Sequence, residues 1–345
     1  MIILRWDIGI DLGTQNVRMA ELKSGPVLDM PSAMAFREGR VAPICAGEIA
    51  QRLIGRTCEG VEVVWPLSDG VLESSFYAER LFRWLFQKSE ALKRRRHYRA
   101  IIACQPFARP VQRDALLNAA IEAGAAEAML VRSDVATALG AGLDISAPEA
   151  KLLVDVGAGK VSATLFTYGR VAAYGYVPYG LNRIDERIRS IMRVKYGYRI
   201  GWSASAEIKH TLGNAMPDKA PKDIIMHMVG INMAERLPMT FDVETQPVLD
   251  ACDDVVSEIA RMCAAVVDAA PEGLAADLND AGAVLAGAGA SMTELDRRLG
   301  QTLGIPCRVA DAPATCAARG MAKIIENPTP WADMMQGHQA RTVWR

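Results

Sequence analysis

The sequence predicts an α/β fold made of two similar halves. Short apolar runs typical of strands alternate with segments whose apolar residues recur at helical spacing. The pattern of residues 8–22, two short strands joined by a Gly-containing turn, recurs at residues 152–166. Asp11 and Asp155 occupy the same place in the two copies, so we expect two similar domains that face each other.

Composition limits the class of protein. The 345 residues are 50% hydrophobic, and the formal net charge of −1 argues against a protein that binds nucleic acid by neutralising phosphates. The scattered cysteines and histidines lack C-x-x-C or ligand spacing, which predicts reduced thiols and no zinc site. No apolar run is long enough to span a membrane and no signal peptide is recognisable, so we expect a cytoplasmic protein.

Helices and further strands follow each hairpin. In the first half, the pattern predicts helices at 78–88 and 112–124 and strands at 99–106 and 128–132. In the second half, it predicts helices at 184–196, 204–212, 248–269 and 291–303, and a strand in AVLAGAGA (283–290). The tail after Asn327 lacks periodicity, and we expect it to be loosely held.

Three glycine-containing turns carry the predicted chemistry: residues 11–16, 155–160 and 286–290. Glycine allows close backbone approach, so that amide N–H groups can converge on phosphate oxygens. An Asp at the end of a central strand beside such a turn can hold Mg²⁺ through water, and two such residues could clamp a metal–triphosphate. An ordinary hairpin also needs glycine, but three turns in this order favour a phosphate site.

These turns resemble the two phosphate motifs and the adenosine motif of actin-fold ATPases. Over nearly its whole length the chain resembles the MreB family of bacterial actins, through segments such as IGIDLGTQN, ALGAGLDISAPEAKLLVDVGAGK, SAEIKHTLGNA and AAPEGLAADLNDAGAVLAGAGA. The resemblance implies two duplicated RNase H-like domains, each with a small subdomain, around a central nucleotide cleft. It places domain I at 1–145 plus 316–345 (small subdomain 33–75) and domain II at 146–315 (small subdomain 182–245).

The resemblance also implies ATP and Mg²⁺ as cofactors. Asp11 and Asp155 would hold the metal through water and position the attacking water. The predicted nucleotide-binding residues are Gly13, Thr14, Gln15, Asn16, Gly157, Ala158, Gly159, Lys160, Glu207, Lys209, Gly287, Ala288 and Gly289. Glu207 is included because the usual ribose-contacting Glu of the family falls on its neighbour, Ala206.

Departures from the family pattern predict a nucleotide site that has lost some of its functional residues. The family Glu thought to orient the attacking water falls on Ser133, which cannot act as a base at neutral pH without a base of its own, although Asp134 could substitute if the loop shifts. The second phosphate loop usually reads Asp-Ile-Gly-Gly-Gly-Thr-Thr-Glu, and here its last three positions are Lys160, Val161 and Ser162. We therefore expect weak nucleotide binding, or none, with little or no hydrolysis.

Lys160 allows three interpretations. Its ammonium could contact a phosphate, as lysines of phosphate loops do, or it could be a solvated charge at a hairpin tip. It could also imitate the metal and leave the cleft without nucleotide.

Two segments could contact the inner membrane. In Met1–Trp6 the apolar residues 1–4 and Trp6 could insert, while Lys93–His97 is a basic cluster that could lie on anionic lipid. The alternative is a solvated loop and an ordinary N-terminal strand. Within Met226–Met233 the methionines could form either an adaptable interface or plain core.

The leading functional hypothesis is an MreB-like cytoskeletal protein that forms head-to-tail filaments under the inner membrane, in cell-shape determination. The alternative is a non-polymerising pseudo-ATPase scaffold, or a modulator that co-assembles with another actin-like filament, including a MamK-like role in positioning organelles. An actin-fold kinase or chaperone ranks last, because the chain has no room for a substrate-binding insertion or a C-terminal β-domain. No nucleic-acid partner is expected, and the role of the tail at 328–345 stays open.

Overall fold

The computed structural model describes residues 6–89, 92, 97–221, 223–339 and 342–343. The chain packs as two compact units. Unit 1 contains Met1–Pro148, Thr167–Arg170 and Ala310–Arg345, and unit 2 contains Glu149–Phe166 and Val171–Val309. Each unit has its own hydrophobic core around a mixed sheet, so the predicted α/β fold is confirmed.

A seven-stranded sheet forms the centre of unit 1. One of its central strands, β1 (Ile8–Leu12), is antiparallel to β2 (Asn16–Glu21) and parallel to β9 (Arg99–Cys104). The order is β20-β19-β10-β9-β1-β2-β3, with β3 at Gly25–Pro31, β10 at Glu127–Arg132, β19 at Met335–Gln339 and β20 at Thr342–Val343.

The C-terminal segment corrects one expectation. Instead of being loosely held, Met335–Gln339 forms β19, which pairs antiparallel with β10 from Val131↔Met335 to Glu127↔Gln339. The unpaired backbone groups at the edge of β10 offer hydrogen bonds to any nearby extended segment, whatever its side-chain periodicity.

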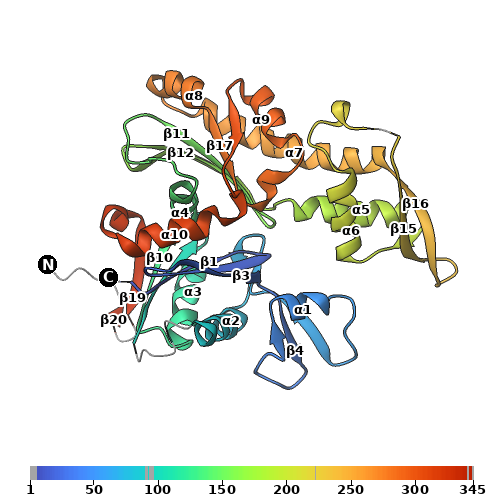
Figure 1. Cartoon of the computed structure of the whole chain (residues 1–345), viewed down its shortest axis with the longest axis horizontal. Helices are drawn as coiled ribbons and strands as arrows, with labels where there is room; N and C mark the ends of the chain where they lie inside the picture. Colours follow the sequence, from blue (N-terminus) through green and yellow to red (C-terminus); the bar gives the residue numbers. More distant parts are fainter. Residues whose placement is uncertain (1–5, 90–91, 93–96, 222, 340–341, 344–345) are drawn as a thin grey trace. The chain divides into compact units, whose positions relative to one another are not determined.

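Helices cover both faces of this sheet (Figure 1). On one face lie α2 (Ser75–Lys88) and α3 (Pro110–Glu122), which pack against each other. On the other lie α4 (Ser133–Gly140) and α10 (Cys316–Glu326). The apolar side chains of β1 (Ile8, Ile10 and Leu12) alternate along the strand and are all buried on one face of the sheet. On the other face, a Cβ at Gly9 would lie 2.9 Å from the Cβ of Met321 on α10, so both faces of the strand are covered.

Unit 1 also carries two small sheets. They consist of β4 (Met34–Arg37), β5 (Cys45–Ala46) and β6 (Val61–Val64) with the short helix α1 (Glu48–Arg52), and of the hairpin β7 (Leu67–Ser68) and β8 (Val71–Leu72).

A five-stranded sheet forms the centre of unit 2, in the order β13-β12-β11-β17-β18. Its strands are β11 (Lys151–Val156), β12 (Val161–Thr167), β13 (Arg170–Val177), β17 (Ala283–Ala286) and β18 (Cys307–Val309). The pairing repeats that of unit 1, since β11 is antiparallel to β12 and parallel to β17. This unit also contains three helices: α7 (Thr245–Asp268), α8 (Ala275–Ala281) and α9 (Leu295–Leu303). Helices α7 and α9 pack against each other, and α8 contacts β11.

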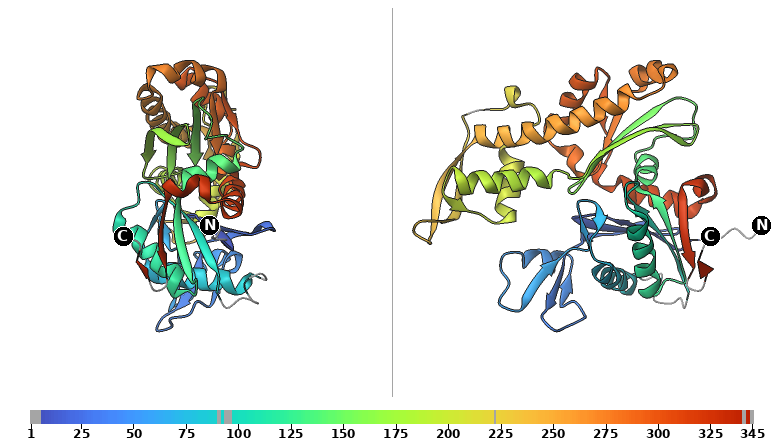
Figure 2. Two further views of the ribbon diagram at one scale, coloured as in Figure 1. Left: turned by 90° about the vertical axis from the view of Figure 1, so that its left-hand side faces the viewer. Right: turned by 180° about the vertical axis from the view of Figure 1, so that it is seen from behind.

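A second layer of unit 2 holds a small antiparallel sheet, β14-β15-β16. It comprises β14 (Tyr198–Arg199), β15 (Ile225–Asn232) and β16 (Pro238–Glu244), together with the helices α5 (Asn182–Val194) and α6 (Trp202–Leu212). Figure 2 shows the long hairpin β15–β16 leading directly into α7.

Candidate nucleotide site

The two Asp-bearing hairpins close in the same way. In unit 1 the amide of Gly13 donates to the carbonyl of Asn16 (3.0 Å), and in unit 2 the amide of Gly157 donates to that of Lys160 (2.9 Å). A Cβ at Gly13 would lie 2.6 Å from the Asn16 carbonyl oxygen, too close for a larger residue. The tight turn therefore requires the glycine, and the duplication extends from strand pairing to individual hydrogen bonds.

The side chains of the first turn hold it to its neighbours. The hydroxyl of Thr14 accepts a bond from the amide of Gly70 (3.0 Å), and the hydroxyl of Ser32 donates to the Thr14 carbonyl (2.9 Å). The side-chain amide of Asn16 donates from Nδ2 to Asp29 Oδ1 (3.1 Å). Thr14 and Asn16 thus have clear structural tasks apart from their predicted contacts with nucleotide.

Asp11, on β1, lies beside a protein cation. Its cross-strand partner is Arg18, whose Nη1 is 3.9 Å from Asp11 Oδ2 and whose Nε donates to Asp29 Oδ2 at 3.0 Å. Gln15, at the tip of the turn, is exposed. The local field at Asp11 is therefore already partly neutralised by a guanidinium within the same hairpin.

The residues at the expected water-orienting position are turned into the protein. Ser133 is buried at the start of α4, and its hydroxyl donates to Gln105 Oε1 (2.8 Å). Asp134 is fully buried and forms a two-point pair with Arg132, with Nε–Oδ1 at 3.0 Å and Nη2–Oδ2 at 2.5 Å. This geometry argues against Asp134 as a substitute for the family Glu, because both of its oxygens are engaged and none of its surface reaches solvent.

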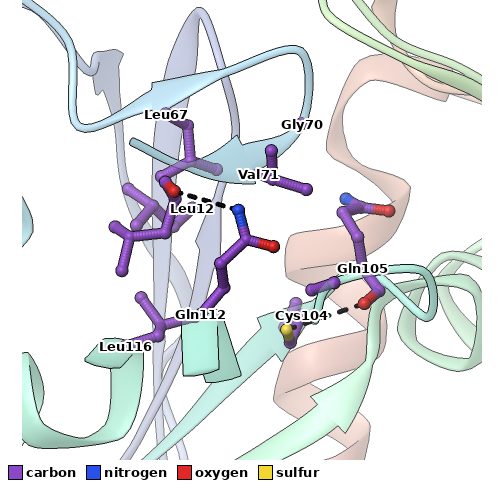
Figure 3. A pocket seen from close by; sticks show the side chains of 11 residues that line it. Leu12, Leu67, Gly70, Val71, Cys104, Gln105, Gln112 and Leu116 are labelled. Atoms are coloured by element: carbon purple, nitrogen blue, oxygen red, sulfur yellow. Dashed lines mark hydrogen bonds between the residues drawn. The ribbon is translucent and has the colours of Figure 1, made fainter. Parts of the chain in front are cut away.

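A small cavity lies beside Gln105 in unit 1 (Figure 3). Its volume is about 20 Å³, which suits a water molecule and not a nucleotide. Gln112 closes one wall by donating from Nε2 to the carbonyl of Leu72 (3.3 Å). Burial raises the pKa of the neighbouring Cys104 thiol to about 11, so this side chain stays protonated and is a poor nucleophile.

In unit 2, Lys160 folds back onto the carboxylate of its own hairpin. Its Nζ lies 2.5 Å from Asp155 Oδ2 and 3.1 Å from the hydroxyl of Ser162. The side chains of Lys160 and Asp155 are only 8% and 11% exposed, and Gly159 beside them is buried. The interpretation of Lys160 as a solvated tip charge is therefore wrong, because the ammonium has a buried partner.

The third glycine turn packs directly on the end of β11. A Cβ at Gly287 would lie 2.4 Å from the carbonyl oxygen of Val156 and 2.7 Å from Asp155 Oδ1. A Cβ at Gly289 would lie 2.7 Å from a side-chain methyl of Val156. Packing against β11 therefore explains why positions 287 and 289 must remain glycine. Ala288, between them in the sequence, carries a methyl group.

The second turn is fixed to the start of α5. The carbonyls of Gly157 and Ala158 accept bonds from the amides of Leu181 (3.1 Å) and Asn182 (3.0 Å). Gly180 permits this approach, because its Cβ would lie 2.2 Å from the Gly157 carbonyl oxygen. The backbone of the turn is therefore held in one position by the helix behind it.

Lys209, on α6, pairs with Asp185 on α5. Its Nζ is 2.5 Å from Asp185 Oδ2 and 3.3 Å from the carbonyl oxygen of Leu181. Burial raises the pKa of Asp185, while the ammonium of Lys209 opposes this shift. Asp185 Oδ1 is buried and finds no hydrogen-bond partner among the described residues. Glu207 lies exposed on the same helix, α6.

The side chains do not fit the water-mediated metal site that the resemblance implies. Asp155 is in direct contact with the ammonium of Lys160, and Asp11 lies beside Arg18. Among the described residues no cluster of three His, Cys, Asp or Glu side chains could hold a metal ion. What remains well formed is the backbone of the glycine turns, which suits phosphate oxygens rather than a cation.

The predicted membrane segments are only partly described. Trp6 is 4% exposed, which removes it from any inserting surface, and its burial reflects its place directly before β1. Residues 1–5 and 93–96 lie outside the described part of the chain, and His97 is exposed. Within the described residues, no helix has the length and apolar character needed to cross a bilayer.

The outer face of the β15–β16 hairpin carries exposed apolar side chains. Alternate residues of β15 point outward, among them Ile225, Val229 and Ile231, and Val229 is 62% exposed. The intervening Met228 is buried in the core of unit 2. Met226 also packs against this core, whereas Met233, just after β15, is 51% exposed. The apolar part of the outward face of β15 is therefore formed by β-branched residues. We call it the outer hairpin face, and it comprises Ile225, His227, Val229, Ile231, Pro238, Thr240, Asp242 and Glu244.

The duplicated hairpins and their two mixed sheets define an actin-like protein. Two solved structures share this fold over nearly their whole length. MreB5 of Spiroplasma citri bound to ADP has a TM-score of 0.87 at 26% identity and covers 95% of this chain and 98% of its own. The MamK double helical filament has a TM-score of 0.77 at 18% identity, over 93% and 98% of the two chains, which supports the fold alone.

Sequence comparison assigns the family. Residues 5–332 match the family described as MreB/Mbl protein. The cell shape-determining protein MreB of Escherichia coli strain K12 is 32% identical over 325 residues, which cover 93% of both chains. The chain belongs to the MreB/Mbl family, and the resemblance predicted from its sequence is confirmed.

Proposed function

We propose that this protein is a cytoskeletal actin of bacterial cell-shape type, which assembles into head-to-tail filaments and binds adenine nucleotide with little or no hydrolysis. The observation that carries the proposal is the family match over residues 5–332, together with its relation to a cell shape-determining protein at 32% identity. A cytoplasmic location at the inner membrane is part of the same proposal.

Nucleotide binding is supported by a relative and by the turns. The similar MreB5 structure is bound to ADP. In this chain, the glycine turns at 13–16, 157–160 and 287–289 keep the tight backbone that phosphate recognition requires. The proposed lack of hydrolysis follows from Ser133, whose hydroxyl donates to Gln105 and cannot activate water as a carboxylate does.

Assembly is tested by electron microscopy of the purified chain with ATP and Mg²⁺ and after complete nucleotide removal. Filaments in the presence of ATP support the proposal, and filaments in both conditions support assembly while separating it from nucleotide. Absence of filaments in both conditions, at concentrations well above those at which a relative assembles, would contradict the filament proposal.

The outer hairpin face is our candidate for the longitudinal contact. We expect Val229→Asp to raise the critical concentration for filament assembly at least tenfold, since an interface at this face would have to desolvate the new carboxylate. Sedimentation and electron microscopy measure the change. Val111→Asp is the matched control, because Val111 is 67% exposed in unit 1, in the first turn of α3, where an acid is tolerated. Equal assembly of the two variants would exclude this face.

Ser133→Glu is expected to raise ATP turnover by at least tenfold, because it returns a carboxylate to the position where the family orients water. Phosphate release measures the rate. Ser133→Gln is the control, because glutamine has the same size and hydrogen-bonding reach as glutamate but carries no charge. If both variants remain as slow as the parent protein, the missing Glu does not limit hydrolysis.

A further inference from the structure

Both carboxylates of the duplicated hairpins lie beside a cation of the protein itself. Lys160 contacts Asp155 in the second hairpin, and Arg18 lies 3.9 Å from Asp11 in the first. The two cations occupy different positions in their hairpins. Arg18 is the cross-strand partner of Asp11, whereas Lys160 belongs to the turn that follows Asp155. The contact in the second hairpin is the shorter and the more buried, and it carries the inference.

Near Asp155, two residues differ in charge from the family pattern, and both differences make the turn more positive. The family pattern places a Thr where this chain has Lys160 and a Glu where it has Ser162. The first change adds one positive charge and the second removes one negative charge, so the turn gains the charge that a divalent cation would bring. The two changed residues also contact each other, because the Lys160 ammonium and the Ser162 hydroxyl are 3.1 Å apart.

The ammonium also excludes a metal sterically. A divalent cation held through water needs room for that water between itself and the carboxylate. Here Nζ lies 2.5 Å from Asp155 Oδ2 with no intervening atom, and both side chains are almost entirely buried. An ammonium has three N–H donors, of which Asp155 and Ser162 take two.

We propose that the Lys160 ammonium takes the place of the divalent cation at Asp155, so that nucleotide phosphates bind this chain without Mg²⁺. The third N–H donor of Lys160 is the one we assign to a phosphate oxygen. The inference rests on the proposed nucleotide binding, and it adds that the cation partner of the phosphates is built into the turn.

The test compares ADP binding in excess Mg²⁺ and in excess EDTA, by calorimetry. For the unsubstituted protein we expect dissociation constants that agree within about twofold in the two conditions. For Lys160→Thr, which restores the family residue, we expect at least tenfold weaker binding in EDTA than in Mg²⁺. Lys219→Thr is the control, because Lys219 is an exposed lysine of the same unit and its loss should leave the protein independent of Mg²⁺.

A loss of tenfold or more for the unsubstituted protein in EDTA would overturn the inference and leave nucleotide binding intact. This comparison does not depend on whether Lys160→Thr folds. If no protein binds ADP in either condition, the nucleotide part of the proposed function is wrong, and melting temperatures with Mg²⁺ alone decide the inference. Stabilisation of Lys160→Thr but not of the unsubstituted protein would support it, and any stabilisation of the unsubstituted protein by Mg²⁺ would contradict it.

Discussion

Gly320→Ala is expected to destabilise unit 1 by about 3 kcal/mol or more, a large effect for the addition of a single methyl group. The helices α4 and α10 cross at two glycines. A Cβ at Gly320 would lie 1.7 Å from the carbonyl oxygen of Ala136, and a Cβ at Gly140 would lie 1.7 Å from that of Cys316. The obstacle is backbone in both cases, so relief requires the two helices to move apart.

Urea unfolding followed by circular dichroism measures this loss. The control is Gly273→Ala, because Gly273 has no heavy atom within 4 Å of an added Cβ and no positive φ. A Gly320→Ala variant as stable as this control would show that α4 and α10 separate easily. Since α4 begins with Ser133, a shift of this helix would also move the position at which the family orients water.

Lys209→Met is expected to cost about 3–5 kcal/mol at pH 7, because it leaves the buried carboxylate of Asp185 without its cation. Oδ1 of Asp185 already lacks a hydrogen-bond partner among the described residues, so the loss of Lys209 leaves Oδ2 in the same condition. Methionine keeps the length and volume of the aliphatic chain, which confines the change to the charge.

The cost should depend on pH in a defined direction. Burial raises the pKa of Asp185, and Lys209 opposes this rise, so the substitution lifts the folded-state pKa further above the unfolded value. The folded state then binds a proton more tightly than the unfolded state, and stability increases as pH falls through the folded-state pKa. Unfolding at pH 7 and pH 5 measures the gain.

The double variant Asp185→Asn/Lys209→Met is the control, and its stability should change much less over this range. Retained stability of Lys209→Met, combined with a loss of ADP binding, would instead favour the predicted role of Lys209 at the nucleotide. The experiment therefore separates a structural ion pair from a ligand contact.

The sequence by itself determined the repeated hairpins and the positions of the main helices. Asp11 and Asp155 recur with the same flanking turn, and the turn needs Gly13 and Gly157 for reasons of local backbone geometry. Helices such as α7 (Thr245–Asp268) follow from apolar spacing within a single segment. These features are local, so the order of residues is sufficient to predict them.

The partners of the site residues were decided by the tertiary structure. The sequence left three interpretations of Lys160 open: a solvated charge, a contact with phosphate, or a substitute for the metal. The structure shows that its ammonium contacts Asp155. Asp134 could not be assigned because its pairing with Arg132 depends on how β10 enters α4.

The same limit explains the other corrections. The burial of Trp6 and the pairing of Met335–Gln339 with β10 depend on residues far away in the sequence. Hydrophobic periodicity records which residues prefer the interior, but not which distant strand edge or opposite charge they meet there. For this protein the sequence determined the fold and the family, and the packed structure decided which of its charges are already neutralised.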